Sequence, residues 1–285
     1  MKPFSNRRAG GEQIRQGGLG IFGIHVRAAI SPFDSPTAIP VYSSVMPEPR
    51  LSVVIPAYNE AARIGSSLEA IQGYLRSRNI LSELIVVDDG SKDDTLQVAA
   101  RCPEVRVLRN DRNRGKGFSV RRGVLEARGQ LILFTDADLS APIEEADKLL
   151  AALESSGADA AVGSRALQRE LIGIHQSWFR EWGGRFFNLL VKLFAGVPIH
   201  DTQCGFKLFR RETTRRAFEC QRVEGFGFDP EVLFLIQRLG GKIVEVPVRW
   251  NHDPATRVRY LRDSLRMTLD LLILRWRALT GQYQM

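Results

Sequence analysis

Features that mark several large protein classes are missing from this chain of 285 residues. Its three cysteines, Cys102, Cys204 and Cys220, are an odd number without C-x-x-C spacing, which argues against a disulfide framework and against a zinc site. Such a composition suits a reducing, cytoplasmic setting. No uninterrupted apolar run approaches the ~18 to 20 residues that a transmembrane helix needs, so we expect any membrane attachment to be peripheral.

Two common nucleotide-binding motifs are also missing. No G-x-G-x-x-G follows the first apolar run and no G-x-x-x-x-G-K-[ST] occurs, which disfavours a dinucleotide-binding Rossmann site and a P-loop NTPase. No run of Lys and Arg resembles a nucleic-acid-binding arm. The formal net charge is nonetheless +8 at pH 7, which favours acidic partners. Phosphorylated substrates and an anionic membrane surface fit this charge better than nucleic acid does.

The composition divides the chain into three segments. Residues 1–48 are rich in Gly, Ser, Pro and Arg without a clear period, and they predict a poorly ordered leader. Met46 lies just before the first apolar run, so translation could begin there instead of at Met1. Residues 49–258 predict one α/β domain, and residues 259–285 predict a C-terminal amphipathic helix that suits a membrane surface.

Apolar runs and helical patterns alternate along the middle of the chain. Strands are predicted at residues 51–55, 84–87, 105–108, 131–135 and 158–162, the first of them ended by Pro56. Helices are predicted at residues 59–76 and 142–154. Another helix is predicted to begin at Asp93, and a further one, after the strand at residues 105–108, to end at about Arg128. This alternation is typical of an α/β fold with a mostly parallel sheet flanked by helices.

Two amphipathic helices are predicted in the C-terminal half. The apolar face of residues 178–194 consists of Trp178, Trp182, Phe186, Leu189 and Leu193, and that of residues 259–277 consists of Leu261, Leu265, Leu269, Leu272 and Trp276. Each helix either covers the sheet or docks on an anionic membrane surface. We favour docking for at least one of them.

Three predicted strands are followed by segments that suit a ligand. These segments are Pro56–Glu60, Asp88–Ser91 and Asp136–Asp138, and ligands of open α/β sheets bind outside the carboxyl ends of the strands. Tyr58 beside a carboxylate suits a nucleobase and its sugar, and the Asp136–Asp138 pair suits Mg²⁺ that bridges two phosphates. An Asp-rich turn with a capping role is the alternative interpretation of that pair.

A basic loop that contains glycine, Arg112–Gly117, follows the third predicted strand. Its cations and flexible backbone suit phosphate groups. A solvated turn is the alternative interpretation.

The motifs resemble a known family. Residues 54–60, Asp88–Ser91 and Asp136–Leu139 resemble the signature of family 2 glycosyltransferases of the GT-A fold. Further motifs resemble the dolichyl-phosphate (polyprenyl-phosphate) β-glucosyltransferases, relatives of the dolichol-phosphate mannose synthases; they are Arg114–Gly117, Gly163–Arg165, Asp201–Lys207, Gly227–Asp229 and Glu245–Trp250. The resemblance covers about residues 50–277, and it implies a GT-A, Rossmann-like sheet and a transferase activity.

The resemblance also implies roles for individual residues. The nucleoside is expected to contact Pro56, Tyr58, Glu60 and Asp88 or Asp89, and Lys116 belongs to the loop expected at the phosphates. Asp136 and Asp138 are expected to hold Mg²⁺ or Mn²⁺ on the donor diphosphate, and Arg165 to meet the acceptor phosphate, with Arg180 and Lys207 as weaker candidates. Asp136, Asp138 and Arg165 are thus the predicted catalytic residues.

One departure bears on the sugar. Ser140 and Ala141 follow the Asp136–Leu139 motif, where the mannose synthases usually carry Gln or His, and this favours glucose over mannose. Eukaryotic relatives carry an N-terminal membrane helix that this sequence lacks. The resemblance therefore implies a protein attached peripherally to the cytosolic face of a membrane.

The predicted reaction is the inverting, metal-dependent transfer of glucose from UDP-glucose to a polyprenyl phosphate, which gives a β-linked product. A phosphate monoester has a second pKa near 6, so this nucleophile is largely ionised at neutral pH and needs no general base. Asp201 or Asp229 could act as the base for a hydroxyl acceptor. The alternatives are a GDP-mannose-dependent polyprenyl-phosphate mannosyltransferase and a non-catalytic nucleotide-sugar-binding, membrane-associated protein.

Overall fold

A computed structural model of the chain describes residues 48–168, 170, 172–174, 178–251 and 260–283. At residues 172–174, 178–186 and 260–263 it describes the backbone only. The predicted leader therefore lies outside the described residues except for Glu48. The described residues all belong to one compact unit, Met46–Met285.

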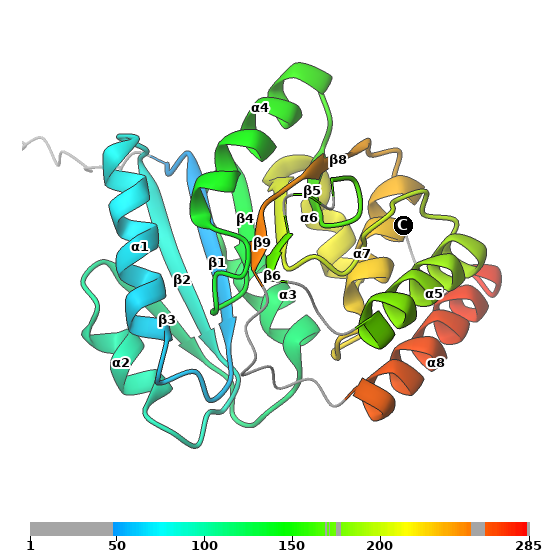
Figure 1. The fold of residues 1–285 in the computed structure, drawn as a ribbon, viewed down its shortest axis with the longest axis horizontal. Coiled ribbons are helices and arrows are strands. Elements are labelled where there is room, and N and C mark those ends of the chain that lie inside the picture. The colour runs from blue at the N-terminus through cyan, green and yellow to red at the C-terminus, as the bar shows by residue number, and fades with distance from the viewer. Residues whose placement is uncertain (1–47, 169, 171, 175–177, 252–259, 284–285) are drawn as a thin grey trace, which may run out of the picture. The chain divides into compact units, whose positions relative to one another are not determined.

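A seven-stranded sheet forms the centre of this unit, in the order β3-β2-β1-β4-β7-β5-β8 (Figure 1). Its strands are β1 (Leu51–Ala57), β2 (Ser82–Asp88), β3 (Val105–Arg109), β4 (Leu131–Thr135), β5 (Ala160–Ser164), β7 (Phe206–Arg210) and β8 (Ile243–Pro247). All neighbouring pairs are parallel except those of β7, which runs antiparallel to both β4 and β5. The short strands β6 (Ile172–Ile174) and β9 (Trp250–Asn251) pair with each other. The mostly parallel α/β sheet is confirmed.

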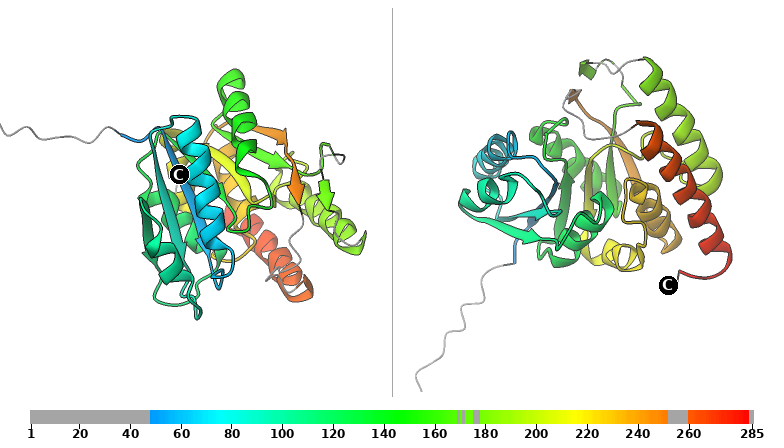
Figure 2. Two further views of the ribbon diagram at one scale, coloured as in Figure 1. Left: turned by 60° about the vertical axis from the view of Figure 1, so that its left-hand side comes forward. Right: turned by 90° about the horizontal axis from the view of Figure 1, so that it is seen from below.

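Helices cover both faces of the sheet (Figure 2). One face carries α1 (Ile64–Ser77), α2 (Thr95–Arg101), η1 (Ile143–Glu145) and α4 (Ala146–Ser156), and the other carries α3 (Lys116–Glu126), α6 (Arg211–Cys220) and α7 (Phe228–Arg238), with α5 (Trp178–Ala195) and α8 (Tyr260–Leu279) packed on α7. Each face has its own apolar cluster. Val53 and Ile55 belong to one cluster and Val54 to the other, as the alternation of side chains along a strand requires.

The predicted start of the first helix is wrong. Helix α1 begins at Ile64 and not at residue 59, because Asn59 has a φ of 56°, a left-handed conformation that a right-handed helix does not contain. Pro56 does not end β1 either. The pairing of β1 with β4 stops at Val54, whereas its pairing with β2 continues to Ala57. Pro56 therefore lies where the strand is paired on one side only, and there a missing N–H is tolerated.

Strand β7 is not predicted from the sequence. Its residues, Phe206–Arg210, are a short run of three apolar and two basic side chains, and the two charges argue against a buried strand. The structure instead inserts β7 between β4 and β5 and buries Lys207 within the sheet. This insertion brings the Asp201–Lys207 motif next to the end of β4. Within the described part of the chain, no helix is both long and apolar enough to cross a bilayer.

Candidate active site

The segments that follow β1 and β2 are hydrogen-bonded to each other at the carboxyl edge of the sheet. The Asn59 amide donates to Ser91 Oγ at 2.9 Å, and the Glu60 amide donates to Thr95 Oγ1 at 2.7 Å. The Glu60 carboxylate forms an ion pair with Arg63 of the same loop. The predicted nucleoside contacts of this loop are half-buried; they are Pro56, Tyr58 and Glu60. The structure thus joins two of the three predicted segments into one rim.

Asp88 is completely buried at the end of β2. Its Oδ1 accepts a hydrogen bond from the Ser91 amide at 3.2 Å. Its Oδ2 has no hydrogen-bond partner among the described residues and faces Arg109 Nε at 3.7 Å. A buried acceptor without a partner is uncommon and costly. This oxygen therefore keeps an unused capacity to accept a hydrogen bond.

Asp89 makes different contacts from Asp88, although the sequence predicts the same role for either residue. Its Oδ1 accepts from the Arg114 amide at 2.9 Å and from Asn110 Nδ2 at 2.7 Å, and its Oδ2 accepts from the Gly115 amide at 2.8 Å. Both oxygens are thus used within the protein. Asp89 fixes the conformation of the basic loop, so of the two aspartates only Asp88 keeps an oxygen without a hydrogen bond.

Lys116 connects the basic loop to the aspartate pair after β4. Its Nζ lies 2.6 Å from Asp136 Oδ1 and 5.3 Å from the centre of the Phe134 ring. Burial opposes the charge of this ammonium. The carboxylates of Asp136, Asp229 and Asp138 outweigh that cost and raise the pKa of Lys116. The loop therefore presents a fixed cation at the carboxylate that was predicted to hold a metal.

Asp136 is held tightly against the backbone of Gly205. The Asp136 amide donates to the Gly205 carbonyl at 3.1 Å. A Cβ atom at position 205 would lie 1.9 Å from Asp136 Oδ2, so only glycine leaves room for this carboxylate. About a third of the Asp136 side chain stays exposed. Gly205, the residue directly before the antiparallel strand β7, thus fixes the position of Asp136 after β4.

Asp138 is half-buried, and its Oδ1 accepts from the Ser140 amide at 3.0 Å. This is the turn-capping contact of the alternative interpretation, but it uses only one of the two oxygens. Among the described residues no group of three or more His, Cys, Asp or Glu side chains could enclose a metal. Mg²⁺ and similar ions need only one or two carboxylates when phosphate oxygens complete their shell. The donor set of Asp136 and Asp138 fits that kind of site.

Arg165, directly after β5, forms a two-pronged ion pair. Its Nε and Nη2 lie 2.6 and 2.8 Å from the two oxygens of Asp201, and its amide donates to the same carboxylate at 3.0 Å. Its guanidinium carbon lies 5.2 Å from the centre of the Trp250 ring. Burial raises the pKa of Asp201, but the Arg165 charge outweighs it, so the pKa lies below its ordinary value. Asp201 therefore orients Arg165.

Lys207 is buried, with 1% of its side chain exposed. Its Nζ donates to Asp229 Oδ1 at 2.6 Å and to the Cys204 carbonyl at 2.5 Å. Burial raises the pKa of Asp229 more than the Lys207 charge lowers it. The Lys207 ammonium is thus buried and held by two acceptors within the protein, and its contact with the acceptor phosphate stays a prediction.

Two further residues complete the survey of the site. The side chain of Arg180, a predicted acceptor contact, lies outside the described part of the structure. Gln203 was not predicted; its Nε2 is buried and has no hydrogen-bond partner among the described residues. It lies in the same loop as Asp201 and Gly205. Its place inside the quoted Asp201–Lys207 motif is the only sequence signal that could have singled it out.

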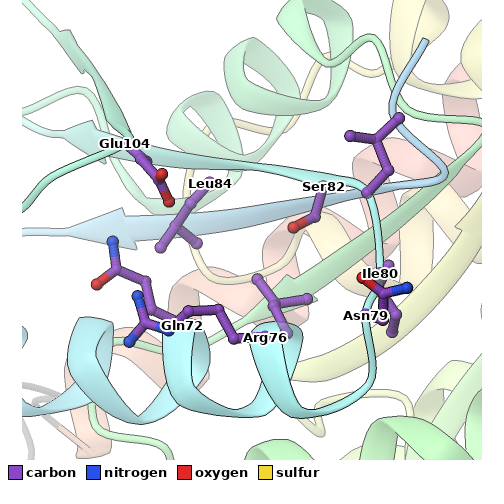
Figure 3. A pocket seen from close by; sticks show the side chains of 9 residues that line it. Gln72, Arg76, Asn79, Ile80, Ser82, Leu84 and Glu104 are labelled. Atoms are coloured by element: carbon purple, nitrogen blue, oxygen red, sulfur yellow. The ribbon is translucent and has the colours of Figure 1, made fainter. Parts of the chain in front are cut away.

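A cavity of about 650 Å³ lies elsewhere, between α1 and the beginning of β2 (Figure 3). Gln72 and Arg76 of α1 line one side of it, and Ser82 and Leu84 line the other. Ser82 is the first residue of β2, whereas the candidate site follows the last residues of the strands. None of the predicted site residues lines this cavity.

The sheet order and the site at its carboxyl edge define an α/β enzyme of the GT-A class. The model of the Glycosyl transferase family 2 matches residues 52–218. The chain belongs to glycosyl transferase family 2, and it is a glycosyltransferase.

Curated relatives cover most of the chain. It is 40% identical to the dolichyl-phosphate beta-glucosyltransferase of Drosophila melanogaster, over 84% of this chain and 78% of that protein. The enzyme of the same name from Saccharomyces cerevisiae is 37% identical, over 82% of this chain and 76% of its own length.

Two solved structures share the fold. Mannosyl-3-phosphoglycerate synthase from Rubrobacter xylanophilus aligns with a TM-score of 0.62 at 21% identity, over 83% of this chain and 76% of that one. Glucosyl-3-phosphoglycerate synthase from Mycobacterium tuberculosis, in complex with Mn²⁺ and UDP-glucose, aligns with a TM-score of 0.60 at 24% identity, over 80% and 79%.

Proposed function

We propose that this glycosyltransferase moves glucose from UDP-glucose to a polyprenyl phosphate, with inversion, to give a β-linked lipid-phosphate sugar. The observation that carries the proposal is the arrangement of charges at the sheet edge. The Lys116 ammonium and the Asp136 carboxylate are in contact, and the Arg165 guanidinium is held by Asp201. Relatives at 35–40% identity that are named dolichyl-phosphate beta-glucosyltransferases support the sugar and the acceptor.

The donor nucleotide is assigned to the rim formed after β1 and β2. The Oδ2 of Asp88, which accepts no hydrogen bond within the described structure, suits an imide N–H such as that of uracil. Tyr58 and Glu60 are half-buried in the neighbouring loop and suit the ring and the ribose hydroxyls. Lys116 and the amides of the basic loop suit the diphosphate. Guanine also offers a ring N–H, so GDP-mannose is the second donor to test.

Asp136 and Asp138 would hold Mg²⁺ or Mn²⁺ at the diphosphate. Such a metal neutralises the charge that develops on the leaving nucleoside diphosphate. A crystallised neighbour that contains Mn²⁺ and UDP-glucose supports this cofactor. The residues of the chain itself have a separate task. Lys116 supplies a fixed cation to the leaving group, and Gly205 keeps Asp136 in place.

The state of the two possible bases favours a phosphate acceptor over a hydroxyl acceptor. Asp201 is committed to Arg165 and its pKa is lowered, so it is a weak proton acceptor. Asp229 is ion-paired with the buried Lys207. Each carboxylate is thus already engaged by a cation of the protein. A phosphate monoester is already ionised near neutral pH, and the Arg165 guanidinium suits it.

The acceptor chemistry also implies a location. A polyprenyl phosphate is anchored in a bilayer, so we place the enzyme peripherally on the cytosolic face of a membrane, where nucleotide sugars are present. Residues 49–258 would form the transferase domain, and residues 259–285 would contribute to the contact with lipid. The non-catalytic alternative has no support in the site, because the carboxylates and cations that the transfer needs are all present.

The test is the release of UDP from UDP-glucose by purified protein with Mn²⁺, with and without a short-chain polyprenyl phosphate in detergent. We expect release only with the lipid phosphate. The proposal fails if no UDP appears while GDP is released from GDP-mannose, since that result identifies a mannosyltransferase. Release that is independent of the lipid phosphate would point to another acceptor or to hydrolysis.

A further inference from the structure

Helices α5 and α8 form an exposed surface that the transfer reaction does not explain. They run side by side (Figures 1 and 2). Only two of the large apolar side chains that are exposed in the described part of the chain, Leu81 and Leu167, lie elsewhere. The others form what we call the α5–α8 face: Leu189, Leu193, Leu265, Leu269, Leu272, Ile273, Trp276 and Leu279.

Helix α8 has two apolar sides, and this excludes simple covering of the sheet as the reason for its sequence. Leu271, Leu274 and Ala278 are buried in the core. The stripe predicted from the sequence is the other one; Leu265 and Trp276, for example, are 65% and 57% exposed. A helix that only packs on a domain needs one apolar stripe. The second stripe is left without a partner in the described structure.

The exposed charges on the described side chains of α5 and α8 are all of one sign. Among the described side chains of the two helices, each exposed one is either a large apolar residue or a basic one, and the basic ones are Lys192, Arg266 and Arg275. On a helix with 3.6 residues per turn, Arg266 and Arg275 fall on opposite edges of the exposed stripe. Long basic side chains at the edges of an apolar face can extend to anionic head groups.

A second copy of the chain is a poor occupant for this face. A two-fold interface would bring the same apolar and basic residues of both copies together. No exposed acidic side chain is available on the described parts of the two helices to offset the repulsion. An anionic bilayer offers both an apolar interior and negative charge, so it is complementary to the face in both respects.

The α5–α8 face is also connected to the candidate active site. A Cβ atom on Gly227 would lie 2.6 Å from Asp270 Oδ2 of α8, so this helix touches the loop before α7. The same loop touches the basic loop, because a Cβ atom on Gly115 would lie 2.4 Å from the Glu224 carbonyl oxygen. Helix α8 is therefore separated by one loop from the residues assigned to phosphate groups.

We propose that the α5–α8 face is the surface by which this protein docks on anionic lipid bilayers. The proposal deepens the proposed function and rests on it for the identity of the acceptor, but not for the docking itself. The aliphatic and Trp side chains enter the acyl boundary, and the flanking Lys and Arg side chains contact the lipid phosphates.

The test measures the binding of the full chain to vesicles of phosphatidylcholine with and without phosphatidylserine. Leu269→Glu places a charge in the face, and Leu81→Glu is its matched control, since the two leucines are 50% and 51% exposed. We expect wild type to bind the anionic vesicles, and Leu269→Glu to weaken the partition coefficient about tenfold or more. Leu81→Glu should bind as wild type does. Circular dichroism and thermal unfolding check that both variants fold.

Three outcomes overturn the proposal: wild type does not bind the anionic vesicles, Leu269→Glu binds them as well as wild type, or light scattering shows a dimer that Leu269→Glu dissociates. UDP release separates docking from catalysis. Leu269→Glu should match wild type with detergent-dispersed acceptor and fall behind with acceptor in vesicles. Normal vesicle binding without UDP release from any acceptor would sink the proposed function and leave the docking surface standing.

Discussion

Lys116 Nζ lies 2.6 Å from Asp136 Oδ1, at the carboxylate assigned to the metal. The protein thus carries an internal cation at the place where the donor diphosphate is expected. When a diphosphate and a divalent cation bind, the Asp136 carboxylate and the phosphate oxygens compete for the Lys116 ammonium. The pair therefore couples the basic loop to the aspartates, and it can be tested from both sides.

Replacing Lys116 by Met keeps the length of the side chain and removes its charge. We expect kcat for UDP release to fall by about 10²- to 10³-fold, because one preorganised cation at the leaving group is lost. The affinity for Mn²⁺ without nucleotide, measured by calorimetry, should rise, since Asp136 no longer has a competing partner. Lys242→Met is the control, because Lys242 is exposed in the loop just before β8. Unchanged turnover in Lys116→Met would remove Lys116 from the diphosphate site.

Gly205→Ala tests the support of Asp136 without changing any charged group. The new methyl group would lie 1.9 Å from Asp136 Oδ2, so the carboxylate has to move. We expect at least about a 100-fold loss of kcat/KM, since small displacements of a catalytic group are that costly, together with weaker binding of Mn²⁺. Gly73→Ala is the matched control: a Cβ atom there meets nothing within 4 Å, and it lies within α1. Wild-type activity in Gly205→Ala would show that Asp136 need not hold this position.

The assignment of Arg165 to the acceptor predicts a selective effect. Arg165→Lys keeps the charge but cannot contact both oxygens of Asp201 and a phosphate together. We expect kcat/KM for the polyprenyl phosphate to fall about 100-fold, while KM for UDP-glucose stays within about twofold of wild type. Arg249→Lys is a comparable change at another arginine, the one that pairs with Glu145. A similar loss of affinity for UDP-glucose in Arg165→Lys would instead assign Arg165 to the donor site.

Much of this site follows from the sequence alone. The strand predicted at residues 131–135 is the observed β4. The segments that follow β1, β2 and β4 lie at the same edge of the sheet, as predicted. Period and turn chemistry identify such parallel strands well, because each is a continuous apolar run. The same reasoning cannot separate Asp88 from Asp89. The two aspartates are equivalent in the sequence, and only the folded loop distinguishes them, because the amides of Arg114 and Gly115 donate to the two oxygens of Asp89.

The parts that the sequence hides are those made by β7. Two of its five residues are basic, which is unusual for a buried strand, and only the tertiary position of Asp229 makes a buried Lys207 tolerable. The close approach of Gly205 to Asp136 joins residues far apart in the chain. For α8, the period shows an apolar stripe but not which neighbour it meets. The buried stripe is Leu271, Leu274 and Ala278, and the more conspicuous one faces outward.

A buried carboxylate near the C-terminus makes the last prediction one of stability. Tyr283 is buried, and its hydroxyl donates to Glu231 Oε1 at 2.5 Å. Oε2 of Glu231 accepts from the amides of Arg222 and Val223 at 3.0 and 2.8 Å. Burial raises the pKa of Glu231 above its ordinary value of 4.5, although these hydrogen bonds oppose the shift. The last described residue is thereby tied to the loop that supports the phosphate-binding residues.

Tyr283→Phe removes one of the groups that stabilise the ionised Glu231, so its folded-state pKa should rise further. A carboxyl group with a raised folded-state pKa makes the fold less stable as pH increases from 4.5 through that pKa. Tyr283→Phe should therefore cost about 1–3 kcal/mol at pH 8 and less at pH 5, as measured by urea unfolding at both values. Tyr74→Phe is the comparison, since Tyr74 donates to a half-exposed Asp147 on the other face. An equal loss at both pH values would show that the contribution of the Tyr283 hydroxyl does not depend on the charge of Glu231.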